Sequence, residues 1–286
     1  MTLFGKVAVL GFGTMGGGIA QVIAQSGRTV VVLETDQARI DNGIAAVDAF
    51  LSSGVTRGKV TEADKEATLA RITGTTLLSD LADVDLVVEA VTERKDIKSA
   101  LLVDVAAVVS VDAVIATNTS ALSVSDLASR LVEPGRVAGL HFFNPAPLMR
   151  VVEVVRALQT AEDVIERLAQ FVGEITKDAV VVKDRPGFLV NKLFMPYIND
   201  VVQAYDDELA SAEDIDTAIK LGLGYKMGPL ELLDLIGLDV HEHATRSAYD
   251  ATLDPIYAPP PLLQTMVAAG MHGNKNGRGF RVGVDK

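Results

Sequence analysis

Short, almost uniformly apolar runs alternate with stretches of helical periodicity over the first 183 residues. The runs lie at 7–10, 29–33, 72–76, 84–90, 113–117, 137–141, 151–155 and 179–182. Strands that lack an alternating polar face are typical of a sheet covered on both sides. The pattern therefore predicts an α/β domain over 1–183, built on a parallel, doubly wound sheet.

Two regions depart from this alternation. Residues 36–71 have helical periodicity with a polar break at 52–59, which predicts a helical hairpin inserted between two strands. Beyond the turn at 184–187 only helical patterns follow, at 188–209, 212–221, 228–237, 240–249 and 262–269. An all-α C-terminal domain is therefore expected over 184–286.

Composition narrows the possible chemistry. The formal net charge of −12 argues against a nucleic-acid partner, and no apolar stretch is long enough to cross a bilayer. The absence of cysteine excludes disulfides, thiolate catalysis and Cys-ligated zinc. His241 and His243 are two residues apart, which does not place them on one helix face, so no metal site is expected. The N-terminus has no basic region typical of a signal peptide, and a cytoplasmic location is expected.

The first apolar run leads into a G-x-G-x-x-G pattern, followed by a helix. Gly11 permits the tight turn, Gly13 lets the backbone approach a pyrophosphate, and Gly16 lets helix and strand pack closely. The phosphates would bind at the free amides of the helix start, where Thr14 and Met15 lie. Together these features predict a Rossmann-type dinucleotide site.

An acidic residue selects between the two dinucleotides. The second apolar run ends in Glu34, about 20 residues after the glycines, where a carboxylate can accept hydrogen bonds from the adenosine ribose. Its charge would repel a 2′-phosphate, so the sequence predicts NAD and not NADP as the cofactor.

Polar residues that follow strands are the candidates for chemistry, because ligands of such sheets bind beyond the carboxyl ends of the strands. Hydroxyls and an amide cluster at 116–121, His141 ends a strand, and Glu153 lies inside an apolar strand. A histidine oriented by a carboxylate is suited to take a proton from an alcohol. Spacing alone leaves open that His141 is a structural histidine and that Glu153 faces solvent.

Seven segments together resemble the L-3-hydroxyacyl-CoA dehydrogenase family, in particular its bacterial 3-hydroxybutyryl-CoA members. The segments are 11–18, 88–91, 118–120, 139–147, 186–191, 213–216 and 227–232. The resemblance implies that His141 and Glu153 form the catalytic pair. It also implies that Ser120 and Asn191 hydrogen-bond the substrate oxygens.

The same resemblance implies further binding residues. Glu93, Lys98 and Asn118 would lie at the nicotinamide end of the cofactor, although Lys98 can also be read as a solvated helix residue. Ser52 and Lys59 would contact CoA, although an exposed loop lysine is usually only solvated. Three positions depart from the family pattern: Thr117 stands where serine is common, Ala121 where a second serine is usual, and Glu34 where aspartate is commoner.

The resemblance implies an NAD-dependent oxidoreductase that interconverts (S)-3-hydroxyacyl-CoA and 3-oxoacyl-CoA, with short chains preferred, in fatty acid or butanoate metabolism. A homodimer formed through the helical domain is also implied. Two alternatives are a dehydrogenase of a free 3-hydroxy acid or sugar acid, and a non-catalytic NAD-binding relative.

Overall fold

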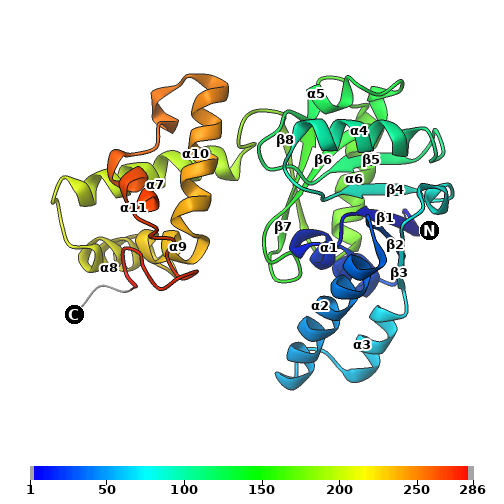
Figure 1. The fold of residues 1–286 in the computed structure, drawn as a ribbon, viewed down its shortest axis with the longest axis horizontal. Coiled ribbons are helices and arrows are strands. Elements are labelled where there is room, and N and C mark those ends of the chain that lie inside the picture. The colour runs from blue at the N-terminus through cyan, green and yellow to red at the C-terminus, as the bar shows by residue number, and fades with distance from the viewer. Residues whose placement is uncertain (1–2, 283–286) are drawn as a thin grey trace. The chain divides into compact units, whose positions relative to one another are not determined.

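The computed structural model describes residues 3–282 and divides into two compact units, with the division between Phe188 and Leu189 (Figure 1). The sequence placed this boundary after Lys183. Residues 184–188 belong to the first unit because Phe188 is buried in one of its apolar clusters. Asp184 also accepts hydrogen bonds there, from Ser123 Oγ at 2.9 Å and from the Ser125 amide at 2.7 Å.

A single sheet of eight strands organises the described part of the first unit, in the order β3-β2-β1-β4-β5-β6-β7-β8. The strands are β1 (Lys6–Leu10), β2 (Thr29–Leu33), β3 (Ile72–Thr75), β4 (Leu86–Glu89), β5 (Val114–Thr117), β6 (Val137–Phe142), β7 (Val151–Arg156) and β8 (Asp178–Lys183). The doubly wound α/β class predicted from the sequence is confirmed.

The expectation of an entirely parallel sheet was wrong at one pair. β7 runs antiparallel to β6, and β8 is parallel to β7. The connection 143–150 is too short for the crossover that parallel neighbours need, which takes a dozen residues or more. In the resulting register His141 lies directly opposite Glu153.

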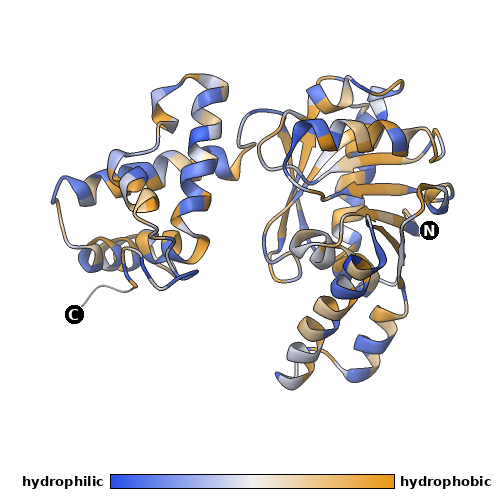
Figure 2. Cartoon of the chain, viewed as in Figure 1, coloured by the Kyte–Doolittle hydropathy of each residue, from blue (hydrophilic) through white to orange (hydrophobic). Residues whose placement is uncertain are grey.

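Helices cover both faces of the sheet because its strands are apolar on both sides (Figures 1 and 2). Val7 and Val9 pack in one apolar cluster with helices at 14–25 and 162–174, whereas Ala8 and Leu10 pack in the other with helices at 95–106 and 124–128. The helices of this unit are α1 (Thr14–Gln25), α2 (Gln37–Thr56), α3 (Glu62–Leu69), α4 (Lys95–Ala106), α5 (Val124–Ala128) and α6 (Glu162–Glu174), with the 3-10 turns η1 (Leu78–Leu81) and η2 (Pro134–Arg136).

The inserted hairpin consists of α2 and α3, and its turn is shorter than expected. The polar break was placed at 52–59, but α2 continues through Thr56. The buried positions of α2 keep helical spacing as far as Leu51, and the Thr56 hydroxyl donates to the Ser52 carbonyl at 3.0 Å, so the polar side chains of this stretch do not end the helix. The helix ends where Gly58 adopts a φ of +65°, a conformation that glycine accepts at helix ends.

The second unit is helical in the described residues, as the sequence predicted. It contains α7 (Val190–Asp206), α8 (Ala212–Leu223), α9 (Pro229–Ile236), α10 (Leu238–Thr252) and α11 (Pro261–Ala268), with the 3-10 turn η3 (Pro255–Tyr257). Ile198, Leu233 and Leu263 are fully buried in its core. Within residues 3–282, no helix is both long and apolar enough to span a membrane.

Candidate active site

The glycine-rich turn has the geometry that a pyrophosphate requires. Gly11 adopts a φ of +91°, and a Cβ on Gly16 would lie 1.9 Å from the Gly11 carbonyl oxygen. A Cβ on Gly13 would meet no atom within 4 Å, so the space before α1 is open. The amides of Thr14 and Met15 lie in the first turn of α1, where amides lack partners inside the helix. The turn can therefore hold a phosphate against backbone N–H groups.

Glu34 is fixed beside this turn by two backbone amides. Its Oε1 accepts from the Phe12 amide at 2.8 Å, and its Oε2 accepts from the Thr35 amide at 2.9 Å. The carboxylate lines a cleft of about 510 Å³ together with Gly13 and Thr14. An anionic wall suits ribose hydroxyls and disfavours a 2′-phosphate. The turn, with Glu34 directly after β2, therefore fits NAD, the cofactor expected from the sequence.

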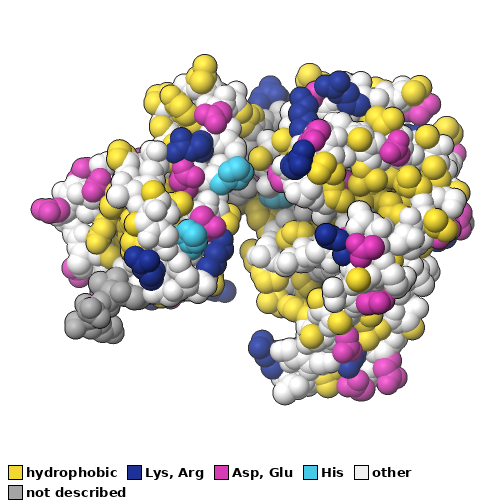
Figure 3. Space-filling view, in the orientation of Figure 1, with side chains coloured by type: hydrophobic (Ala, Val, Ile, Leu, Met, Phe, Trp, Pro, Cys, Tyr) yellow, Lys and Arg dark blue, Asp and Glu magenta, His cyan; other side chains and the backbone are white. Residues whose placement is uncertain are grey.

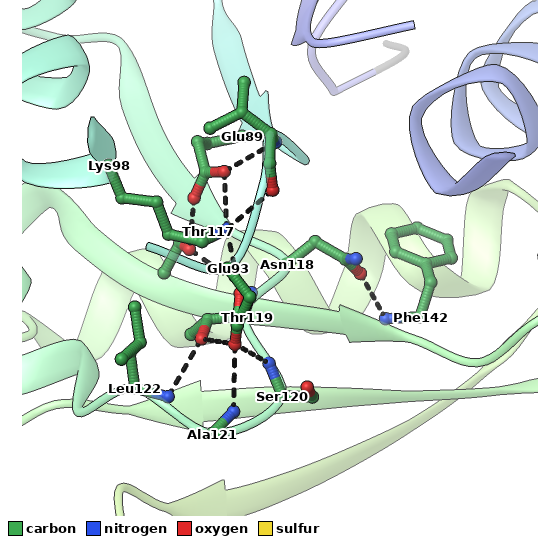
Figure 4. A network of polar contacts seen from close by, with 11 residues as sticks. Glu89, Glu93, Lys98, Thr117, Asn118, Thr119, Ser120, Ala121, Leu122 and Phe142 are labelled. Carbon is green, nitrogen blue, oxygen red and sulfur yellow. Dashed lines mark hydrogen bonds and ion pairs between the residues drawn. The ribbon is translucent and has the colours of Figure 1, made fainter. Parts of the chain in front are cut away.

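A buried ion-pair cluster lies at the carboxyl end of β4 (Figure 4). The Lys98 ammonium is 2.6 Å from Oε1 of Glu89 and 3.1 Å from Oε2 of Glu93. The Lys98 side chain is only 1% exposed, so it is not the solvated helix residue that its sequence context allowed. Glu89 also accepts from Thr117 Oγ1 at 2.6 Å, which gives the threonine at this position a defined role.

Glu93 connects this cluster to the loop after β5. Its Oε1 accepts from the Thr119 hydroxyl, from the Ser120 amide at 2.9 Å and from the Ala121 amide at 3.1 Å. Burial raises the pKa of the Glu93 carboxyl, but the charge of Lys98 and the hydrogen bonds from Thr119 and Ser120 outweigh it and hold the pKa below its ordinary value. An ionised Glu93 therefore fixes the backbone that carries Ser120.

Asn118 joins the ends of β4, β5 and β6. Its backbone N–H donates to the Glu89 backbone carbonyl at 2.7 Å, and its side-chain Oδ1 accepts from the Phe142 backbone N–H at 2.8 Å. Phe142 directly follows His141 on β6. Asn118 therefore links the Glu89 cluster to the strand that carries the histidine (Figure 4).

His141 and Glu153 form a direct contact inside the first unit. Nδ1 of His141 is 2.7 Å from Oε2 of Glu153, and the glutamate side chain is 0% exposed. The rings of Phe143 and Phe188 pack at 4.6 and 5.5 Å from the imidazole. A solvent-facing Glu153, one of the two readings that the spacing allowed, is therefore excluded.

This contact determines which histidine nitrogen is available for proton transfer. A buried carboxylate accepts hydrogen bonds, so it favours the tautomer with the proton on Nδ1. Nε2 is then the nitrogen that can accept a proton from a ligand, and the carboxylate stabilises the resulting imidazolium. The pair is therefore equipped for general acid–base chemistry.

The remaining predicted residues lie elsewhere. Asn191 belongs to the second unit, where it is partly exposed in the first turn of α7, and its contact with substrate stays a prediction. Ser52 is partly exposed on α2, and Lys59 is exposed in the turn before α3. Basic side chains are visible near the free end of this hairpin (Figure 3).

The sequence interpretation missed Glu89. Its signal was present, because Glu89 directly follows the apolar residues Leu86, Val87 and Val88. A carboxylate in a fully buried strand is costly unless donors surround it. The same argument singled out Glu153 but was not applied here.

Comparisons with known proteins agree with this geometry. Family models described as the NAD binding domain and the C-terminal domain of 3-hydroxyacyl-CoA dehydrogenase match residues 6–185 and 187–282. A 3-hydroxybutyryl-CoA dehydrogenase of Mycobacterium tuberculosis is 42% identical over 96% of this chain and 97% of its own. One of Clostridioides difficile is 41% identical over 96% and 98%. The crystal structure of (S)-3-hydroxybutyryl-CoA dehydrogenase from Ralstonia eutropha superposes with a TM-score of 0.94, at 40% identity, covering 99% and 100% of the two chains.

Proposed function

Since this chain belongs to the 3-hydroxyacyl-CoA dehydrogenase family, we propose that it interconverts (S)-3-hydroxyacyl-CoA and 3-oxoacyl-CoA with NAD as the redox partner. The observation that carries this proposal is the buried contact of 2.7 Å between His141 and Glu153, in the unit that holds the NAD site. The names of the relatives support a short-chain substrate such as 3-hydroxybutyryl-CoA.

In this proposal His141 moves the proton of the reaction. Oxidation of the 3-hydroxyl group removes a proton from oxygen and a hydride from carbon. Nε2 of His141 takes the proton, and it returns the proton when the 3-oxo group is reduced. Glu153 keeps the Nδ1 proton in place and stabilises the charge that develops on the ring.

The cofactor supplies the acceptor for the hydride when it is bound. The residues of this chain fix its position: the turn around Gly13 binds the phosphates, and Glu34 binds the adenosine ribose. Ser120 and Asn191 hydrogen-bond the substrate oxygens, which orients the reacting carbon. The backbone of Ser120 is held for this by Glu93.

We assign CoA recognition to the α2–α3 hairpin. Lys59 is exposed in the turn, where an ammonium can pair with a CoA phosphate, and Ser52 lies on the preceding helix. A local positive charge is needed because the chain as a whole carries a net charge of −12.

A comparison of thioester and free acid tests this function. The purified protein is supplied with NAD+ and either 3-hydroxybutyryl-CoA or free 3-hydroxybutyrate, and NADH formation is followed. We expect activity on the thioester and little on the acid. Equal activity on the free acid would favour the alternative of a 3-hydroxy acid dehydrogenase. The absence of activity on both, in a protein that binds NADH, would favour a non-catalytic relative.

We further propose a homodimer formed by the helical unit. Large apolar side chains are exposed on its helices, among them Leu221 on α8 and Leu235 on α9. Burial of such side chains at a two-fold axis would stabilise a dimer. Light scattering of the wild-type protein and of Leu221→Glu would test this, and a monomeric wild type would contradict it. The cytoplasmic location stays a prediction.

A further inference from the structure

The Glu89 cluster carries more negative than positive charge. It contains two carboxylates, Glu89 and Glu93, against the single ammonium of Lys98, at 2.6 and 3.1 Å. Glu89 and Lys98 are almost completely buried. Glu93 is 36% exposed, so the buried Glu89–Lys98 pair is neutral and the net charge of −1 of the cluster lies on its partly exposed side.

Hydrogen-bond donors surround the Glu89 carboxylate. Within the described residues it is contacted by three donors: the Lys98 ammonium at 2.6 Å, the Val91 amide at 2.8 Å and the Thr117 hydroxyl at 2.6 Å. A carboxylate that accepts several hydrogen bonds is stabilised in its charged form. Glu93 is surrounded in the same way by Lys98, Thr119 and two backbone amides.

The Glu89 cluster lies at the end of the sheet where a dinucleotide would bind, and its strand tells which half of the dinucleotide it faces. The strand order reverses between β1 and β4, which is where dinucleotides bind across the carboxyl ends of such sheets. Glu34, at the end of β2, marks the adenosine half. Glu89 ends β4 on the other side of the reversal, and Glu93 binds the loop after β5. The cluster therefore lies on the nicotinamide side.

We propose that Glu89, paired with Lys98 and Glu93, sets the relative affinity of the site for the two redox forms of the cofactor. The nicotinamide ring is positively charged in NAD+ and neutral in NADH. The net charge of −1 of the cluster attracts the positively charged ring and not the neutral ring, so the site binds NAD+ more tightly than an uncharged site would. Glu89 is a positioning and electrostatic residue, not one that touches substrate. This inference rests on the proposed function, because it concerns the NAD site of that enzyme.

Binding measurements without acyl-CoA test the proposal. The dissociation constants of NAD+ and NADH are measured by titration calorimetry for the wild type and for Glu89→Gln, which keeps the shape and removes the charge. A unit charge changes the affinity for a bound cation about tenfold when the two charges are about 12 Å apart and the effective dielectric constant is near 20, and by more when they are closer. We therefore expect the affinity for NAD+ relative to NADH to fall about tenfold or more. An unchanged ratio in a variant that binds both forms would overturn the proposal.

Two control variants separate the charge of the cluster from charges elsewhere on the unit. Asp83→Asn removes an exposed charge just before the start of β4, and Asp112→Asn removes one just before the start of β5, both at the opposite end of the strands. Neither variant should change the affinity for NAD+ relative to NADH. A fall of this ratio in either control variant equal to that in Glu89→Gln would contradict the proposal.

A further variant covers the case in which Glu89→Gln does not fold. Glu93→Gln removes the same charge from a side chain that is 36% exposed, and it should lower the ratio in the same direction. An unchanged ratio in this variant would also overturn the proposal. A wild-type protein that bound neither NAD+ nor NADH would contradict the proposed function itself, and the charge proposal with it.

Discussion

Replacement of Glu153 by glutamine tests the role of the buried carboxylate. Its Oε2 lies 2.7 Å from Nδ1 of His141, and its side chain is fully buried. Two unit charges about 4 Å apart interact by about 4 kcal/mol at an effective dielectric constant near 20. Because each 1.36 kcal/mol is a factor of ten in rate, loss of this interaction in the transition state costs up to about 10³-fold in kcat. The glutamine amide retains a hydrogen bond, so we expect a loss of about 10²–10³-fold.

Steady-state kinetics with acetoacetyl-CoA and NADH provide the assay. In Glu153→Gln, kcat should fall while NADH binding and the circular dichroism spectrum stay those of the wild type. The matched control is Glu162→Gln, which removes an exposed carboxylate paired with Arg156 on the surface and should leave kcat unchanged. A kcat for Glu153→Gln close to that of the wild type would refute the assignment of Glu153 as the partner of the catalytic histidine.

Three further predictions concern other parts of the chain. Glu34→Ala should reduce the preference for NAD over NADP by about tenfold or more, because the repulsion of the 2′-phosphate is removed; an unchanged ratio of kcat/KM values would show that Glu34 does not reach the ribose. Lys59→Ala should raise KM for acyl-CoA by about two- to fivefold with kcat unchanged, as expected for an exposed ionic contact, and an unchanged KM would remove Lys59 from the CoA site. Burial lowers the pKa of His241 from 6.5 to about 4, so between these values the unfolded chain binds a proton that the folded chain does not. The free energy of unfolding should therefore be lower at about pH 5 than at neutral pH, and His241 should contribute about 2 kcal/mol of this difference. Urea titrations at both pH values test this, and an equal loss of stability in His241→Gln and in the wild type would contradict it.

The sequence predicted the elements that depend on local patterns. The strand from Thr29 to Leu33 was located to the residue, because its apolar run is bounded by polar residues on both sides. The turn from Gly11 to Gly16 was identified with its role, because the steric demands of its backbone restrict the residue type. His141 and Glu153 were recognised as a candidate pair from chemistry and resemblance.

Features that depend on pairing between distant residues could not be predicted in the same way. The apolar run of β7 reads the same in both directions; the signal for its antiparallel placement was the short connection 143–150, which was not weighed. The sequence placed Lys98 either at the cofactor or in solvent. Its burial between Glu89 and Glu93 depends on the packing of α4 against β4 and β5, which no local pattern encodes.

The most direct test of the central claim is the reduction of acetoacetyl-CoA by NADH, measured for the wild type and for His141→Ala. We expect the wild type to consume NADH and to form (S)-3-hydroxybutyryl-CoA. His141→Ala should bind NADH normally and turn over about 10²–10⁴-fold more slowly, the usual contribution of general acid–base catalysis. Absence of NADH consumption by a wild-type protein that binds NADH, or near-normal turnover by His141→Ala, would contradict the account.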